Sequence, residues 1–180
     1  MSTQTLYQRT ILFATAKHLE KNQTIPGTEL PYVVHLSNVA MEILLAAPHS
    51  TDFNIDLAVQ VALLHDTLED TSTTFHELET TFGKEVADGV AALTKDDSLA
   101  KELKMQDSLS RIKQQPKEIQ VVKLADRITN LQKPPAHWSP SKIAEYKKEA
   151  EVIVEQLKGS NAYLENRLCD KIEEYSQYIK

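Results

Sequence analysis

The stretch from Val61 to Thr74 reads VALLHDTLEDTSTT and gathers four chemically active side chains. His65 and Asp66 directly follow an apolar run, and Glu69 and Asp70 come one helical turn later. Because residues four apart share a face of a helix, a continuous helix would put His65 over Glu69 and Asp66 over Asp70. The apolar run predicts that this helix is buried, and burying unpaired charge is costly. We therefore expect a divalent cation to balance the charge of this stretch.

The rest of the chain shows the periodicity of helices rather than of strands. Apolar residues recur mostly at spacings of three and four, and only four residues are glycine. We therefore expect an all-α fold, with Leu6, Ile11, Leu12 and Leu19 among the core candidates of the first helix. The predicted helices cover, in order, Thr5–Lys21, His35–Pro48, Ile55–Asp66, Phe75–Phe82, Val86–Leu93, Ser98–Gln115, residues 117–133, Ser139–Lys158 and Ser160–Tyr178.

The length and composition are those of one soluble domain. A chain of 180 residues with 41% hydrophobic and 26% charged residues can bury a substantial core. The chain has neither an apolar segment of the roughly 20 residues that a membrane span needs nor a cleavable signal pattern. We expect a single domain over residues 1–180, in the cytoplasm and away from the membrane. The single cysteine, Cys169, excludes an internal disulfide.

The net charge bears on the kind of partner. A formal charge of −6 disfavours long nucleic acid, whose binding is driven largely by phosphate neutralisation on a basic surface. A small anionic substrate remains compatible with it, because a metal ion and a few local cations override a negative average. Nothing in the sequence indicates an oligomeric state.

Two histidines and two aspartates make a plausible metal set. His35, His65, Asp66 and Asp126 come from three predicted helices. Imidazole together with carboxylate suits Mn, Fe, Co or Zn better than Ca. The alternative is that His35 caps a helix, that His65 is a hydrogen-bonded core histidine and that the aspartates are solvated. The adjacent His-Asp pair within an apolar helix favours the metal site.

The motifs resemble those of a known family. The pattern H35…H65-D66…D126 is similar to the metal signature of the HD phosphohydrolase superfamily. Four further motifs resemble the hydrolase domain of the RelA/SpoT alarmone enzymes: HDTLED, FGKEVADGVAALTK, VKLADRITNL and PYVVH (Pro31 to His35). The resemblance extends from about Ala16 to Tyr146. The chain is too short for the additional synthetase and regulatory domains, so it resembles most the stand-alone small alarmone hydrolases, including the metazoan SpoT homologue type.

This resemblance implies a fold and an activity. It implies a single HD-type helical bundle that acts as a Mn(II)-dependent 3′-pyrophosphohydrolase, although another divalent metal is also compatible. The substrate would be guanosine 3′,5′-bis(diphosphate), called ppGpp, or its 5′-triphosphate form pppGpp. The products would be GDP or GTP together with pyrophosphate.

The resemblance also implies roles for individual residues. His35, His65, Asp66 and Asp126 would hold the metal, and Glu69 and Asp70 would be the catalytic pair. Substrate contacts would come from Asn130, from the aromatic residues Tyr32, Trp138 and Tyr146, and from the cations Lys123 and Arg127, with Lys95 as a further candidate. For each cation a solvated or ion-paired position is an equally reasonable interpretation. For the aromatic residues the alternative is ordinary packing.

The chain departs from the family pattern before PYVVH. Alarmone hydrolases usually carry an Arg-Lys pair after a glutamine there, whereas this chain reads Gln23, Thr24, Ile25, Pro26. The departure leaves the metal motif intact but opens the identity of the base. Alternative substrates are an adenosine alarmone or another 3′- or 2′-phosphorylated nucleotide such as NADPH. A non-catalytic nucleotide-binding regulator is a further alternative.

Overall fold

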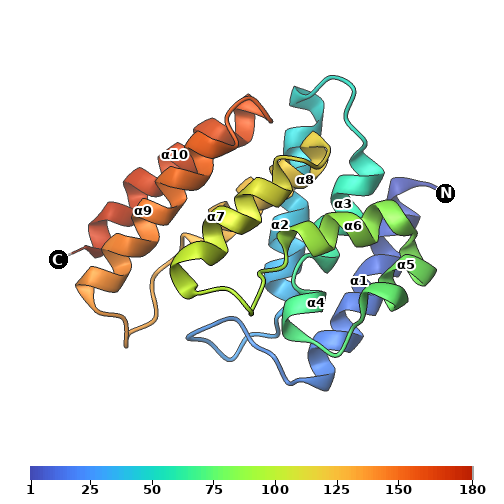
Figure 1. Ribbon diagram of the computed structural model, residues 1–180, viewed down its shortest axis with the longest axis horizontal. Helices are drawn as coiled ribbons and strands as arrows, with labels where there is room; N and C mark the ends of the chain where they lie inside the picture. Colours follow the sequence, from blue (N-terminus) through green and yellow to red (C-terminus); the bar gives the residue numbers. More distant parts are fainter. Residues whose placement is uncertain (180) are drawn as a thin grey trace.

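The computed structural model describes residues 1–179 and confirms the all-α fold (Figure 1). In Figure 1, α9 and α10 lie side by side at one end of the molecule, and α1 and α5 lie at the other. An isolated antiparallel bridge joins Thr24 and Pro31 in the loop before α2. The helices are α1 (Thr3–Glu20), α2 (Val33–Ala46), α3 (Ile55–Leu64), α4 (Thr67–Asp70), α5 (Phe75–Phe82), α6 (Lys84–Leu93), α7 (Lys101–Ile112), α8 (Lys117–Asn130), α9 (Pro140–Gln156) and α10 (Ala162–Tyr175), with 3-10 turns at Ala47–His49 and Ser176–Tyr178.

Helix α3 lies at the centre of the fold. Its residues Leu57, Ala58, Val59 and Val61–Leu64 are all buried. Helices α1, α2, α6 and α8 pack around it. A helix that is apolar over most of its circumference is stable only when other helices enclose it. The prediction that the run before His65 is a buried helix is therefore confirmed.

Short polar residues define several helix ends. The side chains of Asn54, Thr74, Ser139 and Asn161 each accept a hydrogen bond from a backbone N–H in the first turn of the following helix. Such caps satisfy donors that have no partner within the helix. Gly83 ends α5 at a φ of 92°, in the left-handed region that favours glycine. These boundaries agree with the predicted ones to within a few residues.

The expected core residues of the first helix were partly wrong: Ile11 packs against the core, whereas Leu12 and Leu19 are exposed. Leu12 is 72% exposed and Leu19 is 54% exposed. The residues that α1 buries are Thr10, Ala14 and His18. Small and polar side chains therefore form part of the face of α1 that packs towards α3, and hydrophobicity does not mark them. The two leucines lie on the opposite, solvent-facing side.

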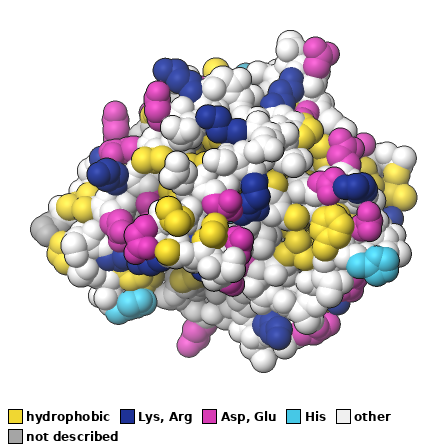
Figure 2. All heavy atoms as spheres, viewed as in Figure 1, with side chains coloured by type: hydrophobic (Ala, Val, Ile, Leu, Met, Phe, Trp, Pro, Cys, Tyr) yellow, Lys and Arg dark blue, Asp and Glu magenta, His cyan; other side chains and the backbone are white. Residues whose placement is uncertain are grey.

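The surface mixes charges of both signs. Figure 2 shows acidic and basic side chains interspersed over the face that it presents. Within residues 1–179, no helix has the length and apolarity that a bilayer crossing requires. Cys169 is a free, exposed thiol.

Candidate active site

The central helix stops just before the His-Asp pair. Helix α3 ends at Leu64, and the separate short helix α4 begins at Thr67. His65 Nδ1 lies 2.8 Å from the Ala62 carbonyl oxygen, and Thr67 Oγ1 donates to the Leu64 carbonyl at 2.7 Å. These side chains satisfy backbone carbonyls that a continuing helix would have bonded. Helix α3 thus ends two residues before the predicted boundary at Asp66, and Glu69 does not lie on a continuation of the same helix.

The break changes how the motif is presented. His65 and Asp66 lie at the end of the buried helix, while Glu69 and Asp70 belong to the next short turn. The Asp70 N–H still donates to the Asp66 carbonyl at 2.9 Å, so this turn stays tied to the pair. The four side chains thus reach the same cavity from two short segments.

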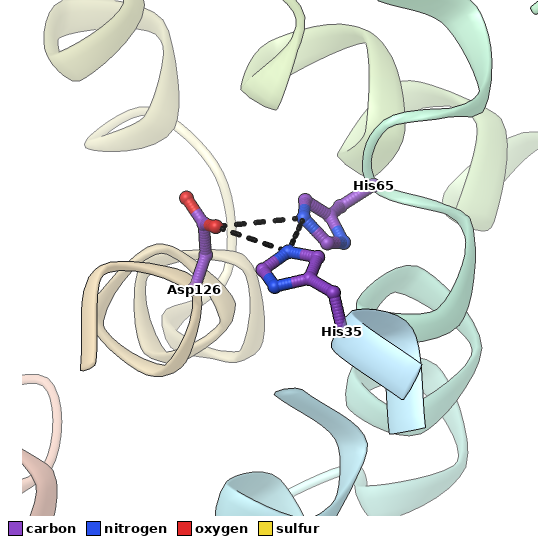
Figure 3. Close-up of side chains that lie close together, drawn as sticks. All are labelled: His35, His65 and Asp126. Carbon is purple, nitrogen blue, oxygen red and sulfur yellow. Dashed lines mark hydrogen bonds and ion pairs between the residues drawn. The ribbon is translucent and has the colours of Figure 1, made fainter. Parts of the chain in front are cut away.

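Two imidazoles and two carboxylates converge from helices that are distant in the sequence. Figure 3 shows the side chains of His35, His65 and Asp126 pointing toward one another. His35 Nε2 lies 3.3 Å from His65 Nε2, and Asp126 Oδ1 lies 3.5 Å and 3.6 Å from these two nitrogens. Asp66 Oδ2 lies 2.9 Å from His65 Nε2 and 3.8 Å from His35 Nε2. His35, His65 and Asp126 are each more than nine-tenths buried.

The donor set fits a divalent metal. Ligand atoms about 2.1 Å from one ion lie about 3.0–3.6 Å apart in octahedral or tetrahedral geometry, which is close to the spacing observed. The bond between His65 Nδ1 and the Ala62 carbonyl requires the ring proton on Nδ1, which leaves the lone pair of Nε2 facing the cluster. His35 Nδ1 lies 3.4 Å from Thr129 Oγ1. Both rings are therefore held by a contact at Nδ1, with Nε2 facing the cluster.

The electrostatics of the cluster favour charged carboxylates. Burial opposes the ionisation of Asp126, but Lys123 at 3.0 Å and the two histidines hold its pKa well below the usual range. The pKa of Asp66 is lowered as well, because its contact with His65 outweighs burial. Burial alone would lower the pKa of His65, yet Asp66 and Asp126 raise it well above the ordinary value. The cluster thus attracts positive charge, which a divalent cation would supply.

Three of the residues expected at the substrate instead contact this cluster. Asn130 Nδ2 donates to Asp126 Oδ1 at 2.6 Å, and Lys123 Nζ donates to Asp126 Oδ2. The Tyr32 hydroxyl donates to Asp66 Oδ2, and burial together with this carboxylate raises the pKa of Tyr32. Each also lines the cavity, so contact with a substrate remains open to them.

Glu69 and Asp70 have different environments. Glu69 Oε1 accepts from Lys95 Nζ at 2.7 Å and forms an ion pair. Asp70 Oδ2 accepts from the neutral amide of Gln23 at 2.7 Å. The cavity wall partly desolvates Asp70 and, with the nearby charges of Asp66 and Glu69, raises its pKa. Asp70 therefore holds a proton more readily than an ordinary aspartate does.

The cluster opens into a cavity of about 410 Å³. That volume lies within the range of about 300–1,000 Å³ that small-molecule sites occupy. The walls are formed mainly by α4, the end of α6, α7, α8 and α9. The predicted site residues that line it are Tyr32, His65, Asp66, Glu69, Asp70, Lys123, Asp126, Arg127, Asn130 and Tyr146, together with the further candidate Lys95.

Two predicted residues lie outside this lining. His35 contributes from behind, through its contact with His65. Trp138 packs edge-on against Tyr146, with ring centroids 5.1 Å apart. Tyr32 is the first lining residue in chain order, so the altered Gln23–Pro26 segment does not form part of the wall.

Arg127 is a buried cation beside the cavity. It is 6% exposed, with its guanidinium carbon 4.2 Å from the ring centre of Tyr146 and Nη2 3.3 Å from Glu149 Oε2. Its Nε and Nη1 have no hydrogen-bond partner within residues 1–179. The buried guanidinium places positive charge beside the cavity, which favours an anionic group there.

Sequence reasoning missed one wall of the cavity. Helix α7 contributes Lys101, Lys104, Met105 and Ser108. Their spacing of three, four and seven residues places them on one face of the helix, and this pattern is visible in the sequence. Nothing local, however, indicates that this face points to the histidines rather than to solvent.

Comparison with known proteins places the chain in a family. Residues 12–159 match the family model of the HD domain. The chain is 38% identical over 164 residues to the Danio rerio protein named guanosine-3′,5′-bis(diphosphate) 3′-pyrophosphohydrolase MESH1, with 88% of each chain covered. It is 36% identical over 161 residues to the Homo sapiens protein of that name, with 87% of each covered. A solved structure of a metazoan ortholog of SpoT, described as hydrolysing ppGpp, superposes with a TM-score of 0.80 and 28% identity over 97% of both chains. The chain therefore belongs to the HD-domain family that includes the MESH1 proteins.

Proposed function

We propose that this protein is a Mn(II)-dependent hydrolase that removes the 3′-pyrophosphate of guanosine 3′,5′-bis(diphosphate), or of its 5′-triphosphate form. The products are pyrophosphate and GDP or GTP. The observation that carries the proposal is the convergence of His35, His65, Asp66 and Asp126 next to a nucleotide-sized cavity whose wall holds Glu69 and Asp70. The named activity of the MESH1 relatives supports the same reaction.

The metal would be held by His35, His65, Asp66 and Asp126. Mixed imidazole and carboxylate ligands suit Mn(II). Hydrogen bonds from Tyr32, Lys123 and Asn130 orient the two carboxylates. When bound, the cation would polarise the phosphorus–oxygen bond and lower the pKa of water next to it.

Glu69 and Asp70 act on the proton of the attacking water. Glu69 is held by its contact with Lys95 and accepts a hydrogen bond from the water. Asp70, whose pKa is raised, takes the proton that the attacking water releases and passes it to the leaving-group oxygen. Two carboxylates with different environments thus have different roles: Glu69 orients the water and Asp70 transfers its proton.

The remaining cavity residues bind an anionic nucleotide. Arg127 adds positive charge to the cavity wall that attracts a phosphate group, and the ring of Tyr146 packs against its guanidinium. Tyr32 and Asn130 contact the sugar or base at the edge of the metal cluster. Trp138 acts on the substrate through Tyr146, which it supports edge-on.

We place this activity in one HD-type domain that spans residues 1–180 and works in the cytoplasm. One continuous hydrophobic core joins residues of α1 through α10, which supports a single folding unit. A small nucleotide is the partner, and long nucleic acid and membranes are not.

The test is hydrolysis by the purified protein. The metal-free protein is incubated with Mn(II) and ppGpp, and release of pyrophosphate is measured. Asp66→Ala is expected to abolish release, whereas the surface variant Asp88→Ala, which removes only an exposed pair with Lys84, is expected to retain it.

A substrate panel separates the proposal from its alternatives. Adenosine 3′,5′-bis(diphosphate), NADPH and deoxynucleoside monophosphates are assayed beside ppGpp. Faster turnover of one of these would replace the proposed substrate within the same enzyme class. Binding of a nucleotide without turnover of any, with Mn(II) bound, would contradict an enzymatic function and favour a regulator.

A further inference from the structure

Gln23 connects a buried histidine to a carboxylate of the site. Its Nε2 lies 2.7 Å from Asp70 Oδ2, and its Oε1 lies 2.5 Å from His18 Nδ1. His18 comes from the last turn of α1 and is 2% exposed, and Gln23 lies in the loop that follows. Neither residue belongs to the metal cluster or lines the cavity. Gln23 therefore contacts the site through Asp70, and His18 does so through Gln23 and Tyr32.

The chemistry of the three groups fixes their orientation. An ionised carboxylate only accepts hydrogen bonds, so the amide of Gln23 must turn its NH2 group to Asp70. Its oxygen then faces His18, whose Nδ1 must carry the proton. Burial lowers the pKa of His18, which keeps the ring neutral with a single N–H. A neutral Nδ1–H histidine thus holds the amide in the one orientation that donates to Asp70.

The backbone holds Gln23 in this place. Its N–H donates to the His18 carbonyl at 3.1 Å, and its carbonyl accepts from the Tyr32 N–H at 3.2 Å. Asn22 adopts a φ of 49°, a left-handed conformation that asparagine tolerates, and this turns the chain back over the end of α1. The His18 ring also stacks on Tyr32 at 4.8 Å between centroids. The loop is therefore a rigid support for the Gln23 side chain.

We propose that Gln23, oriented by His18, is a positioning residue that holds the Asp70 carboxylate in its reactive orientation. The inference rests on the proposed hydrolase function, in which Asp70 is one of the catalytic pair. Because the Tyr32 hydroxyl donates to Asp66, His18 supports both the catalytic carboxylate and a metal ligand from one ring. The altered segment before PYVVH thus keeps its glutamine for positioning although it lacks the family's basic pair.

The consequence is a defect in turnover rather than in binding. Gln23→Met keeps the length of the side chain and removes both hydrogen bonds, so Asp70 loses its fixed orientation. We expect kcat to fall about 10-fold or more, the magnitude typical when a residue that orients a functional group is replaced, while KM changes less than about threefold. Mn(II) affinity is expected to stay within about threefold of the wild-type value, because the four ligands and their contacts remain.

A matched control is available on α3. Gln60 is also half-buried, and its Nε2 donates to the Asp56 carbonyl at 2.9 Å, but it does not line the cavity. Gln60→Met therefore removes a comparable hydrogen bond without touching Asp70. We expect it to leave kcat and KM unchanged.

His18→Phe tests whether His18 orients the Gln23 amide. The substitution keeps an aromatic ring against Tyr32 but removes the Nδ1–H that orients the amide. We expect the same loss of kcat as in Gln23→Met, and no further loss in the double variant, because both changes release one carboxylate. Two independent structural defects would instead multiply.

A spectroscopic readout accompanies the kinetics. The carbon-13 chemical shift of the Asp70 carboxyl is expected to move in Gln23→Met and in His18→Phe but not in Gln60→Met. An active wild type whose Gln23→Met variant keeps full kcat, or whose double variant shows multiplied losses, would overturn the inference while the proposed function stands. An inactive wild type would overturn the proposed function, and the carboxyl shift would still decide whether Gln23 sets the state of Asp70.

Discussion

His35 Nε2 and His65 Nε2 face each other at 3.3 Å although the two residues are 30 positions apart in the sequence. His65 Nδ1 is hydrogen-bonded to the Ala62 carbonyl, so the lone pair of His65 Nε2 points at the His35 ring. Two such nitrogens beside two aspartates are stable only when a positive charge lies between them. This single contact joins α2 to the end of α3 and defines the centre of the site.

Replacing Asp126 by asparagine is expected to remove the metal without unfolding the protein. Asp126→Asn keeps the side-chain volume but loses the charge that binds the cation and pairs with Lys123. We expect metal affinity to fall by more than the roughly 10- to 100-fold that is lost when a residue that only contacts a metal ligand is replaced. Elemental analysis after gel filtration measures the bound metal, and circular dichroism checks the fold. Full metal content in the variant would show that Asp126 is not a ligand.

Tyr32→Phe tests the support of Asp66. The variant keeps the ring that stacks on His18 and removes only the hydroxyl that donates to Asp66. We expect a loss of about 10- to 100-fold in Mn(II) affinity, with restoration of activity at high Mn(II). Titration calorimetry with Mn(II) gives the affinity. If affinity is unchanged and KM for the nucleotide rises instead, Tyr32 serves the substrate rather than the metal ligand.

Metal binding is expected to stabilise the fold. A ligand that binds only the native state adds about 2.7 kcal/mol to the free energy of unfolding at 100 times its dissociation constant. Mn(II) added to the chelator-treated protein should therefore raise the Tm in thermal scans, and Ca(II) should raise it less because the set contains two imidazoles. The Asp126→Asn protein is the control, and an equal shift in that variant would place the effect at another site.

Tyr146 and Trp138 are expected to differ in importance. Tyr146 lines the cavity and packs against the Arg127 guanidinium, whereas Trp138 packs edge-on against Tyr146 and lies outside the lining. Tyr146→Ala should raise KM for the nucleotide by about 10-fold or more, since a stacked or cation-π contact contributes about 1–2 kcal/mol. Trp138→Ala should raise KM several-fold less. Steady-state kinetics decide the order, and the reverse order would place Trp138 directly on the substrate.

Gly89 is expected to be required for packing of α6. Alanine would favour the helix by about 1 kcal/mol, but its Cβ would lie 2.6 Å from Ile119 Cδ1 and 3.1 Å from Val61 Cγ2. Both neighbours are buried, so we expect Gly89→Ala to lower the free energy of unfolding by about 1–3 kcal/mol.

Ile119→Val supplies the matched rescue for that change. It deletes the Cδ1 atom that the new methyl group would meet, at a cost of about 0.5–1.5 kcal/mol on its own. The double variant should therefore be more stable than the sum of the two single changes predicts. Urea unfolding of the four proteins measures this coupling, and strict additivity would show that α6 and α8 have room to separate.

The sequence by itself determined the helices and the chemistry of the motif. Periodic apolar residues, caps such as Thr74 and Asn161, and Gly83 act within one or two turns, so their signals are local and readable. The types of the metal-competent residues and their family resemblance are equally local. These features were enough to predict an all-α HD domain and its candidate ligands.

Only the tertiary structure decided which of these side chains meet. The approach of His35, His65 and Asp126 depends on how α2, α3 and α8 pack, and that packing sums many weak contacts between distant residues. The same packing exposed Leu12 and Leu19, buried His18 and turned one face of α7 to the cavity. The break after Leu64 arose because side-chain hydrogen bonds replaced those of the helix. Spacing along the chain does not encode such competition, since its outcome is set by the surroundings of each group.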